Sequence, residues 1–248
     1  RGEKRRVLEV CILADAQAQY EDFGAGEPST MNRETIVQKL LKSGIWPVIK
    51  QRPFDVVANP AQEPKAVFIS AFDSAPLAPD QDLVVRNHGA DLQAGLDALA
   101  KLTKGKVHLC VSDKTAAREF LDAKGVTRHT ISGPHPAGNV GVQMHAISPL
   151  NKGDLAWTVG VQDVLMIGRL FRQGRFDASR TVAVTGSEAR NAKYVRTVIG
   201  APVKDLIGNA DGHARVISGN CLTGDNVGRD GYLGFYHTQI TVMPEGDA

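Results

Sequence analysis

The stretch KAVFISAFD, residues 65–73, decides the fold together with ADLQAGLDALAKLTKG at 90–105 and KVHLCVS at 106–112. The first and third are short apolar runs bounded by turn residues, a pattern typical of buried strands. The middle one places Leu92, Leu96 and Leu99 on one side of a helix and ends at Gly105. Strand, helix and strand in this order predict a parallel sheet with helices packed on it.

The same alternation extends to both sides of this unit. Strands are predicted at RVLEVCILA (6–14) and VTRHTIS (126–132), and helices at RETIVQKLLKSG (33–44), at KTAAREFLDAKG (114–125) and along the apolar face from Val161 to Phe171. Prolines at 47 and 53 disfavour a helix in IWPVIKQRPF. We therefore predict an α/β fold with a doubly wound sheet.

The character of the sequence changes after about Ala178. RTVAVTG (180–186), ARVISGN (214–220) and GYLGFYHTQITVMP (231–244) read as strands joined by glycine-containing turns, with one short helical segment at PVKDLIG (202–208). This pattern predicts a second, smaller α+β unit. The predicted organisation is a strand and linker over 1–20, an α/β domain over 21–177 and the smaller domain over 178–248.

Composition excludes several classes of protein. The chain has 248 residues, 42% hydrophobic and 23% charged, with a net charge of +2, which is ordinary for a globular protein and does not favour a nucleic-acid partner. Its three cysteines are far apart, and His213 and His237 are isolated in sequence, so we predict neither a disulfide framework nor a metal site. No run of 18 apolar residues is present to span a bilayer.

The loop GPHPAGNVG, residues 133–141, has the glycines of a nucleotide-binding loop but not their spacing. It matches neither the dinucleotide fingerprint nor the P-loop, and its two prolines remove backbone N–H donors from any phosphate cradle. Two interpretations stay open. The loop is a rigid strand-to-helix turn, or it contacts a ligand through His135.

Several long stretches carry a family resemblance. SGIWPVIKQRPF (43–54), AVFISAFDSAPLAPD (66–80), GPHPAGNVG (133–141), WTVGVQDVLMIGRLF (157–171) and VAVTGSEARNAKYVRTVIGAPVKDLI (182–207) resemble the A subunit of the bacterial Na+-translocating NADH:quinone oxidoreductase, the Nqr complex. The resemblance implies a Rossmann-like α/β domain followed by a β-grasp domain of the soluble-ligand-binding type. It also implies an N-terminal barrel-sandwich region and a C-terminal helical region outside this sequence, so residues 1–20 are expected to hold the strand that leaves the first of them.

The resemblance also implies a function. The family's complex is a redox-driven sodium pump that oxidises NADH and reduces ubiquinone, and this chain is expected to be a peripheral subunit on the cytoplasmic side of the bacterial inner membrane. Its partners would be the other subunits, notably the integral membrane subunit of the quinone site, with NADH and flavins held elsewhere. The isolated chain is expected not to be catalytic, and no catalytic residue is assigned.

More distantly, the chain resembles the C subunit of Rnf complexes and the flavin- and NADH-binding subunit of respiratory complex I. Those relatives carry a glycine-rich loop, G-x-G-G-A-G-F-P in kind, where this chain has SGIWPVIKQRPF. Bulky β-branched residues do not readily adopt the positive φ that such a cradle needs. A second, acidic turn of the relatives is replaced by ISAFDSAPLAPD, which keeps only Asp73 near the strand end. We infer a flavoprotein scaffold that no longer binds a cofactor.

A quinone or a protein partner fits what remains. A quinone head is a flat ring with two carbonyl acceptors, so it needs an apolar stacking surface and one or two donors. The altered loops offer aromatic rings and donors for this purpose, and the candidates are Trp46, Lys50, Arg52, Phe54, Phe72 and His135. Core packing is the competing interpretation for the aromatic residues Trp46 and Phe72, and solvation or interface pairing for the cations.

The stretch SEARNAKYVRTVIG, residues 187–200, offers a candidate docking patch made of Arg190, Lys193, Tyr194 and Arg196. A solvated loop leading into a strand is the competing interpretation. Two further functional interpretations stay open for the whole chain: an electron-input domain that binds FMN or NADH, and a pure scaffold without a small-molecule ligand.

Overall fold

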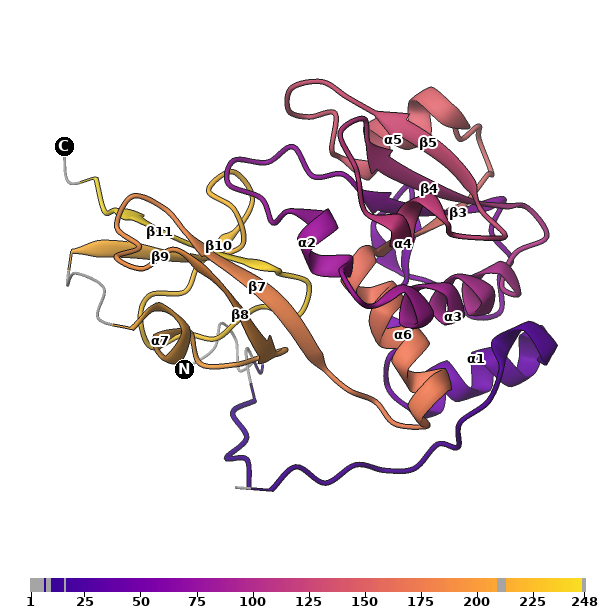
Figure 1. The fold of residues 1–248 in the computed structure, drawn as a ribbon, viewed down its shortest axis with the longest axis horizontal. Helices are drawn as coiled ribbons and strands as arrows, with labels where there is room; N and C mark the ends of the chain where they lie inside the picture. The colour runs from indigo at the N-terminus through magenta and orange to yellow at the C-terminus, as the bar shows by residue number, and fades with distance from the viewer. Residues whose placement is uncertain (1–6, 8–9, 16, 209–212, 247–248) are drawn as a thin grey trace.

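The structure is a computed structural model that describes residues 7, 10–15, 17–208 and 213–246. Two units lie side by side, each built around its own sheet (Figure 1). The helices of the first unit are α1 (Arg33–Lys42), α2 (Gln81–Val85), α3 (Gly89–Ala100), α4 (Arg118–Leu121), α5 (Val140–Ile147) and α6 (Val161–Gln173), with 3₁₀ turns η2 (Pro28–Thr30) and η3 (Trp46–Val48). Its strands are β1 (Lys50–Arg52), β2 (Val56–Val57), β3 (Ala66–Ala71), β4 (Lys106–Ser112), β5 (Thr127–Ile131) and β6 (Ala156–Gly160).

The first sheet has the order β2-β1-β6-β3-β4-β5. Strands β6, β3, β4 and β5 run parallel, whereas β1 and β2 continue the sheet in antiparallel pairing. The β3 sequence AVFISA is almost wholly buried, as expected of a parallel strand that is covered on both faces. The chain must therefore cross over between neighbouring strands, and the crossover helices supply that cover.

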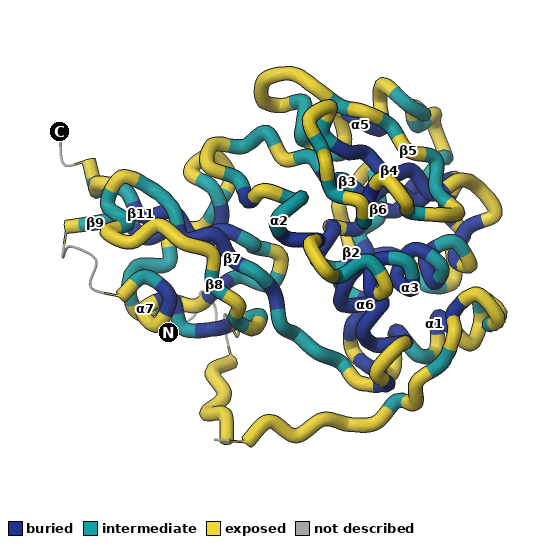
Figure 2. Tube along the Cα trace, in the orientation of Figure 1, coloured by how far each residue is buried: buried dark blue, intermediate teal, exposed yellow. Residues whose placement is uncertain are grey.

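Both faces of this sheet carry helices. Val67 and Ile69 of β3 point into a core shared with α1, α3 and α6, while Phe68 points to the opposite face. There it packs with Cys110 and with Met144 of α5. Figure 2 shows the buried strands between these helical layers. Burial on both faces is what fixes the register of the sheet, because a slip by one residue would exchange the two side-chain sets.

Helices α3 and α6 cross at unusually short range because each presents a glycine to the other. A Cβ on Gly168 would lie 1.8 Å from the backbone oxygen of Asp91, and one on Gly95 would lie 2.2 Å from that of Val164. An ion pair between Arg172 and Asp91 spans the same crossing. Because glycine has no side chain, the two helix backbones come into direct contact, and this contact sets how closely α3 and α6 pack.

The second unit contains a five-stranded sheet of order β10-β9-β11-β7-β8. Its elements are β7 (Ser179–Thr185), β8 (Lys193–Val198), α7 (Val203–Ile207), β9 (Ala214–Ser218), β10 (Asp225–Asn226) and β11 (Gln239–Pro244). Strand β11 runs parallel to β7, and the remaining pairs are antiparallel. Val182, Val216, Ile240 and Val242 form its core with Val203 of α7.

Polar contacts between the first turn of α6 and β7 tie the two units together. The Gln162 side-chain amide donates to the Thr181 carbonyl and accepts from its N–H, both at 2.7 Å. Arg180 of β7 pairs with Asp163 of α6 at 3.1 Å. Because both pairs are largely buried, the second sheet is held in a defined position against the first unit.

The predicted alternation is largely confirmed, with two corrections. The strand predicted over 6–14 is wrong for its described residues, Val7 and 10–14, which form no strand and whose large apolar side chains are exposed (Figure 2). No neighbouring strand pairs with them, and an isolated strand leaves its backbone groups without partners. The rest of that segment lies outside the described residues.

The second correction concerns the helix predicted over 114–125, which is reduced to α4. The Asp82 carboxylate accepts bonds from the Thr115 hydroxyl and from the N–H groups of Ala116 and Ala117. These bonds hold residues 115–117 outside the helix, which starts only at Arg118. Strand β6 is an element that the sequence prediction missed, because its run is short and continues directly into the periodic pattern of α6.

Candidate functional site

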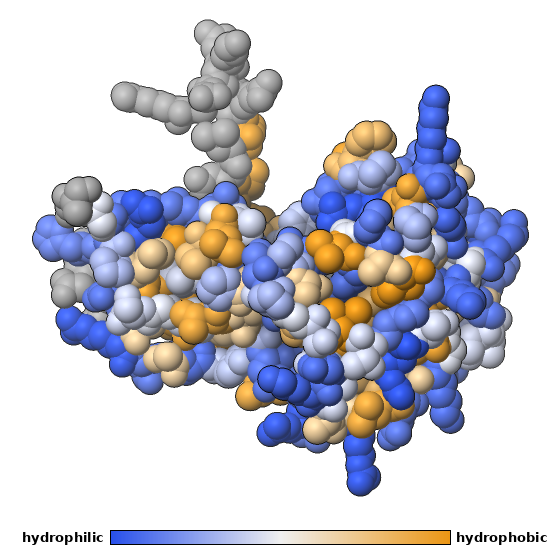
Figure 3. All heavy atoms as spheres, turned by 90° about the horizontal axis from the view of Figure 1, so that it is seen from above, coloured by the Kyte–Doolittle hydropathy of each residue, from blue (hydrophilic) through white to orange (hydrophobic). Residues whose placement is uncertain are grey.

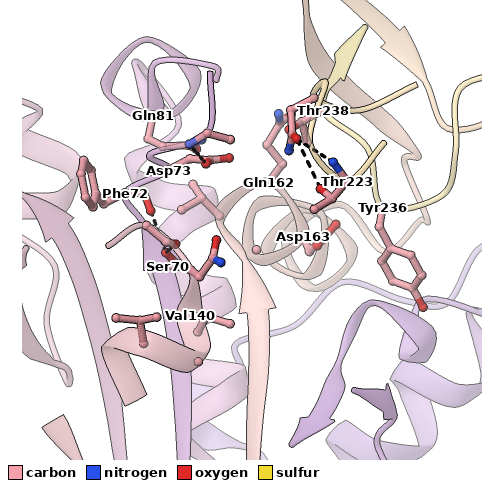
Figure 4. A pocket seen from close by; sticks show the side chains of 18 of the residues that line it. Ser70, Phe72, Asp73, Gln81, Val140, Gln162, Asp163, Thr223, Tyr236 and Thr238 are labelled. Atoms are coloured by element: carbon pink, nitrogen blue, oxygen red, sulfur yellow. Dashed lines mark hydrogen bonds between the residues drawn. The ribbon is translucent and has the colours of Figure 1, made fainter. Parts of the chain in front are cut away.

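A cleft of about 600 Å³ lies between the two units, at the edge of the first sheet where β3 and β6 end. Its lining comes from the residues after β3, from the loop before α5, from the start of α6, and from loops of the second unit. Open α/β sheets bind ligands at the carboxyl ends of their strands, and the volume is within the range of small-molecule sites. Figure 4 shows Phe72, Asp73 and Gln81 on one side of this cleft and Thr223, Tyr236 and Thr238 on the other.

The first wall is the segment that follows β3. Ser70, the penultimate residue of β3, donates its hydroxyl hydrogen to the Phe72 carbonyl at 3.0 Å, and Asp73 turns the chain by accepting from the Ala75 N–H at 2.8 Å. Both bonds close the backbone locally. The Phe72 ring, half-buried, is left as the apolar surface of this wall.

The glycine loop, residues 133–141, forms the neighbouring wall. The N–H of Ala137 donates to the Pro134 carbonyl and that of Asn139 to the Pro136 carbonyl, while Gly138 donates to the Ser74 hydroxyl at 2.8 Å. A Cβ on Gly138 would lie 2.2 Å from the Ser74 nitrogen, so glycine is needed for this close approach. These three amides are already paired within the protein, and the loop presents His135 to the cleft.

The opposite wall belongs to the second unit. Tyr236 donates its hydroxyl hydrogen to the Pro47 carbonyl at 3.0 Å, and the Lys50 ammonium lies 4.5 Å from the centre of its ring. The ring is therefore fixed across the boundary between the units. Asn220 and Thr223 complete this wall, with the Asn220 side chain accepting from the N–H of Thr223.

A buried ion pair lies at the base of the cleft. Asp163, in the first turn of α6, binds Arg180, which also donates to the His237 carbonyl at 3.0 Å. Burial raises the pKa of Asp163 to about 6, while Arg180 and the Gly160 amide act in the opposite direction. Burial likewise lowers the pKa of Arg180. Both shifts mean that the pair exists as ions only because each charge has the other as its partner.

The cleft brings together three of the quinone-binding candidates that were predicted from the sequence: Arg52, Phe72 and His135. Lys50 lies beside them, against Tyr236. The Phe54 side chain is 81% exposed and does not line the cleft.

Trp46 is placed differently, with only 4% of its surface exposed. Its indole N–H donates to the Ala58 carbonyl at 2.7 Å, and its ring meets that of Trp157 edge to face at 5.6 Å. Of the two interpretations given for Trp46, core packing is the one that this burial supports. The 3₁₀ turn η3 carries the side chain inward because Val48 and Ile49 are buried beside it.

The docking candidates lie on and before the edge strand β8. Arg190 precedes the strand, and Lys193, Tyr194 and Arg196 belong to it. Tyr194 and Arg196 make internal contacts that connect the strand to the rest of the protein. The Tyr194 hydroxyl accepts from the Asp80 N–H at 2.9 Å, and Arg196 donates to the Ser179 hydroxyl at 2.9 Å. The strand thus contributes to the boundary between the units as well as to the surface.

Several lining residues were not found from the sequence. Asp163 follows β6, and the rule that strand ends carry site residues would have found it only if that strand had been predicted. Tyr236 and Thr223 come from loops of the other unit, where no local pattern marks them. Within the described residues, no group of three or more histidine, cysteine, aspartate or glutamate side chains is arranged to hold a metal ion. None of the helices described has the length and apolarity needed to cross a bilayer.

The fold and the cleft define a two-unit α/β protein with a candidate ligand site where parallel strands end beside a second, mixed sheet. Residues 31–176 match the family model described as the NqrA second alpha/beta domain, and residues 181–229 match the NQRA C-terminal domain. The chain belongs to the NqrA family, the A subunits of the Na+-translocating NADH-quinone reductase, as the resemblance in its sequence indicated.

Curated relatives support this assignment. The chain is 39% identical to the A subunit of the Na(+)-translocating NADH-quinone reductase of Vibrio alginolyticus and 37% identical to that of Serratia proteamaculans, over 99% of its own length. It spans 56% of the length of each of these relatives. Figure 3 shows hydrophobic side chains grouped on the surface of both units in this two-unit piece of the family fold.

Solved structures add a likeness in fold. An NAD+-reducing [NiFe]-hydrogenase in the H2-reduced state superposes with a TM-score of 0.61 at 14% identity, over 87% of this chain and 48% of that one. The air-oxidised state gives a TM-score of 0.60. At this identity the likeness concerns the arrangement of both units and carries no activity across.

Proposed function

We propose that this chain is part of a peripheral subunit of a redox-driven sodium pump and that its cleft binds the ubiquinone head. The pump oxidises NADH and reduces ubiquinone, and the subunit docks on its membrane partners at the cytoplasmic side of the bacterial inner membrane. In this proposal the first unit is a Rossmann-like flavoprotein scaffold and the second a β-grasp unit, NADH and flavins being held by other subunits.

The observation that carries the quinone site is the composition of the cleft. Phe72 and Tyr236 offer ring surfaces from opposite units, while His135 and Arg52 bring donors to the same cavity. A quinone needs this combination, because its flat ring gains from apolar contact and its two carbonyl oxygens accept hydrogen bonds. Asp163 is already paired with Arg180 and adds no unpaired anion near those oxygens.

The loss of a flavin cradle is supported by the backbone of residues 43–54. The N–H groups of Gly44, Val48 and Ile49 donate to Leu41, Ile45 and Trp46 carbonyls. Strand β1 then pairs with β2 on one side and β6 on the other. Amides engaged in this way are not available to a phosphate, so the scaffold is expected to bind neither FMN nor NADH through this segment.

For docking, we propose the surface around β8. Lys193 projects from an edge strand, and Arg190 lies in the turn that precedes it. An edge strand with cations on its surface suits an acidic face of a neighbouring subunit. Lys193→Glu in the assembled complex is expected to weaken retention of this subunit. Lys152→Glu, an exposed lysine in the loop before β6, is the matched control.

The quinone site is tested by a thermal-shift titration with ubiquinone-1, FMN and NADH in parallel, because a ligand of the folded state raises the melting temperature with its concentration. We expect saturable stabilisation by ubiquinone-1 alone. Phe72→Ala is expected to weaken that binding about tenfold, since it removes an aromatic contact. Phe54→Ala, the same change at an exposed ring outside the cleft, is the matched control.

Each arm of this titration has a distinct meaning. Stabilisation by FMN or NADH would overturn the lost-cradle proposal and favour an electron-input domain. No stabilisation by any of the three would favour a scaffold without a small-molecule ligand. Equal losses in Phe72→Ala and Phe54→Ala would remove the cleft as the quinone site.

A further inference from the structure

Two hydrogen bonds through Ser74 connect Gly138 and His135, which both belong to the glycine loop. The Gly138 N–H donates to the Ser74 Oγ at 2.8 Å, and that oxygen lies 3.2 Å from Nδ1 of His135. Ser74 follows β3, whereas His135 and Gly138 precede α5, so these bonds join two loops that are 61 residues apart at the Ser74–His135 contact. Ser74 is partly buried behind the wall, and His135 lines the cleft.

The direction of the second bond follows from the number of hydrogens available. A hydroxyl has one hydrogen to donate, and a neutral imidazole has one N–H and one acceptor nitrogen. With one Ser74 lone pair taken by Gly138, the arrangement that gives the hydroxyl hydrogen an acceptor is donation to Nδ1. The reverse direction would leave that hydrogen without a partner among the described residues. Nδ1 therefore accepts, and Nε2 carries the ring hydrogen.

We propose that Ser74 is a positioning residue that locks His135 in the Nε2–H tautomer, so that the cleft presents a hydrogen-bond donor. Nε2 has no bond to any described residue, and its hydrogen is left for a ligand. A quinone carbonyl oxygen only accepts hydrogen bonds and meets this donor well. A hydroquinone hydroxyl also accepts from this donor, but its own hydrogen finds no acceptor on the ring and that hydrogen bond is lost. The site thus selects the oxidised ligand, an inference that rests on the proposed quinone function.

The tautomer is measured directly by long-range ¹H–¹⁵N correlation of the histidine rings in the full chain. The spectra are recorded at pH 8.5, because the two nitrogens of a neutral imidazole have distinct shifts. We expect a pure Nε2–H pattern for His135, identified by its loss in His135→Gln. Ser74→Ala should give a mixture of tautomers and Ser74→Thr, which keeps the hydroxyl, should retain the pattern. Ser132→Ala, at an exposed serine nearby, is the control.

The selectivity is measured by anaerobic titration with ubiquinone-1 and ubiquinol-1. Wild type is expected to bind the quinone about fivefold more tightly, the ratio that one hydrogen bond contributes. In Ser74→Ala the ratio should approach one, because the ring is free to accept from the quinol. An Nδ1–H pattern in wild type, or a ratio that Ser74→Ala leaves unchanged, would overturn the role of Ser74. A locked Nε2–H tautomer without quinone binding would instead contradict the proposed function.

Discussion

The crossing of α3 and α6 gives the sharpest test of the fold, through Gly168→Ala. A Cβ at this position would lie 1.8 Å from the Asp91 backbone oxygen, and ordinary contact begins at 3.4 Å, so the helices would have to separate by about 1.6 Å. The obstacle is backbone, which cannot rotate away as a side chain can. Crowding of this kind typically costs about 1–3 kcal/mol and occasionally more.

An opposing effect has to be subtracted. Alanine is favoured over glycine inside a helix by about 1 kcal/mol. Taking the upper end of the crowding range, we expect Gly168→Ala to lower the free energy of unfolding by about 2 kcal/mol. For a chain of this size, that corresponds to a fall in melting temperature of roughly 4–8 °C.

The assay is urea unfolding followed by tryptophan fluorescence, since Trp46 and Trp157 are the only two tryptophans of the sequence and both are buried. Gly141→Ala, in α5, is the matched control. A Cβ there meets nothing within 4 Å, so the same substitution should leave stability unchanged or raise it by up to about 1 kcal/mol. Equal stability of Gly168→Ala and wild type would refute the close helix crossing.

Three further predictions concern buried polar groups. Arg180→Met leaves Asp163 buried without its cation and should cost about 3–5 kcal/mol of unfolding free energy, whereas the double variant with Asp163→Leu should recover more than half of it. His108 is buried and its Nδ1 lies 2.8 Å from Nε2 of the half-buried His129, and this pair should make the protein acid-sensitive. Burial, then the charge of His129, lowers the pKa of His108 to about 4, so the unfolded chain takes up the proton first as the pH falls. Stability should be full above about pH 6.5 and decline by up to about 1.4 kcal/mol per pH unit towards pH 4. Unfolding curves of His108→Leu over the same pH range should show a smaller decline. Trp46→Phe should cost about 1–2 kcal/mol of unfolding free energy in the same assay, because removal of the indole N–H leaves the buried Ala58 carbonyl without its partner. A neutral effect would contradict the place of Trp46 in the core.

Local patterns were sufficient to predict most of the regular structure. The apolar run of β3 and the helical spacing of Leu92, Leu96 and Leu99 each depend on residues close in sequence, and both elements form where they were predicted. The failures occurred where a distant group intervened. Asp82 holds 115–117 outside the helix, and the segment over 6–14 lacks a strand to pair with in its described part.

The candidate site was predictable only as a set of loops. Phe72 and His135 were named because strand ends and an unusual loop mark them, and the strand order places both on one cleft. Trp46, named on the same grounds, is instead part of the core, since residue type alone does not tell which way a ring points from a short 3₁₀ turn. Tyr236 carries no local signal at all.

What the sequence by itself determined is the family, the alternation of strands and helices, and the change to a second unit, because periodicity and turn chemistry act over a few residues. Only the tertiary structure decided which side chains meet. Tyr236 reaches Pro47 across 189 residues, and Ser74 reaches His135 across 61. Such contacts depend on the order in which strands join a sheet and on how the second sheet packs against α6. Both depend on how the complete chain buries its apolar surface, and a local sequence pattern does not carry that information.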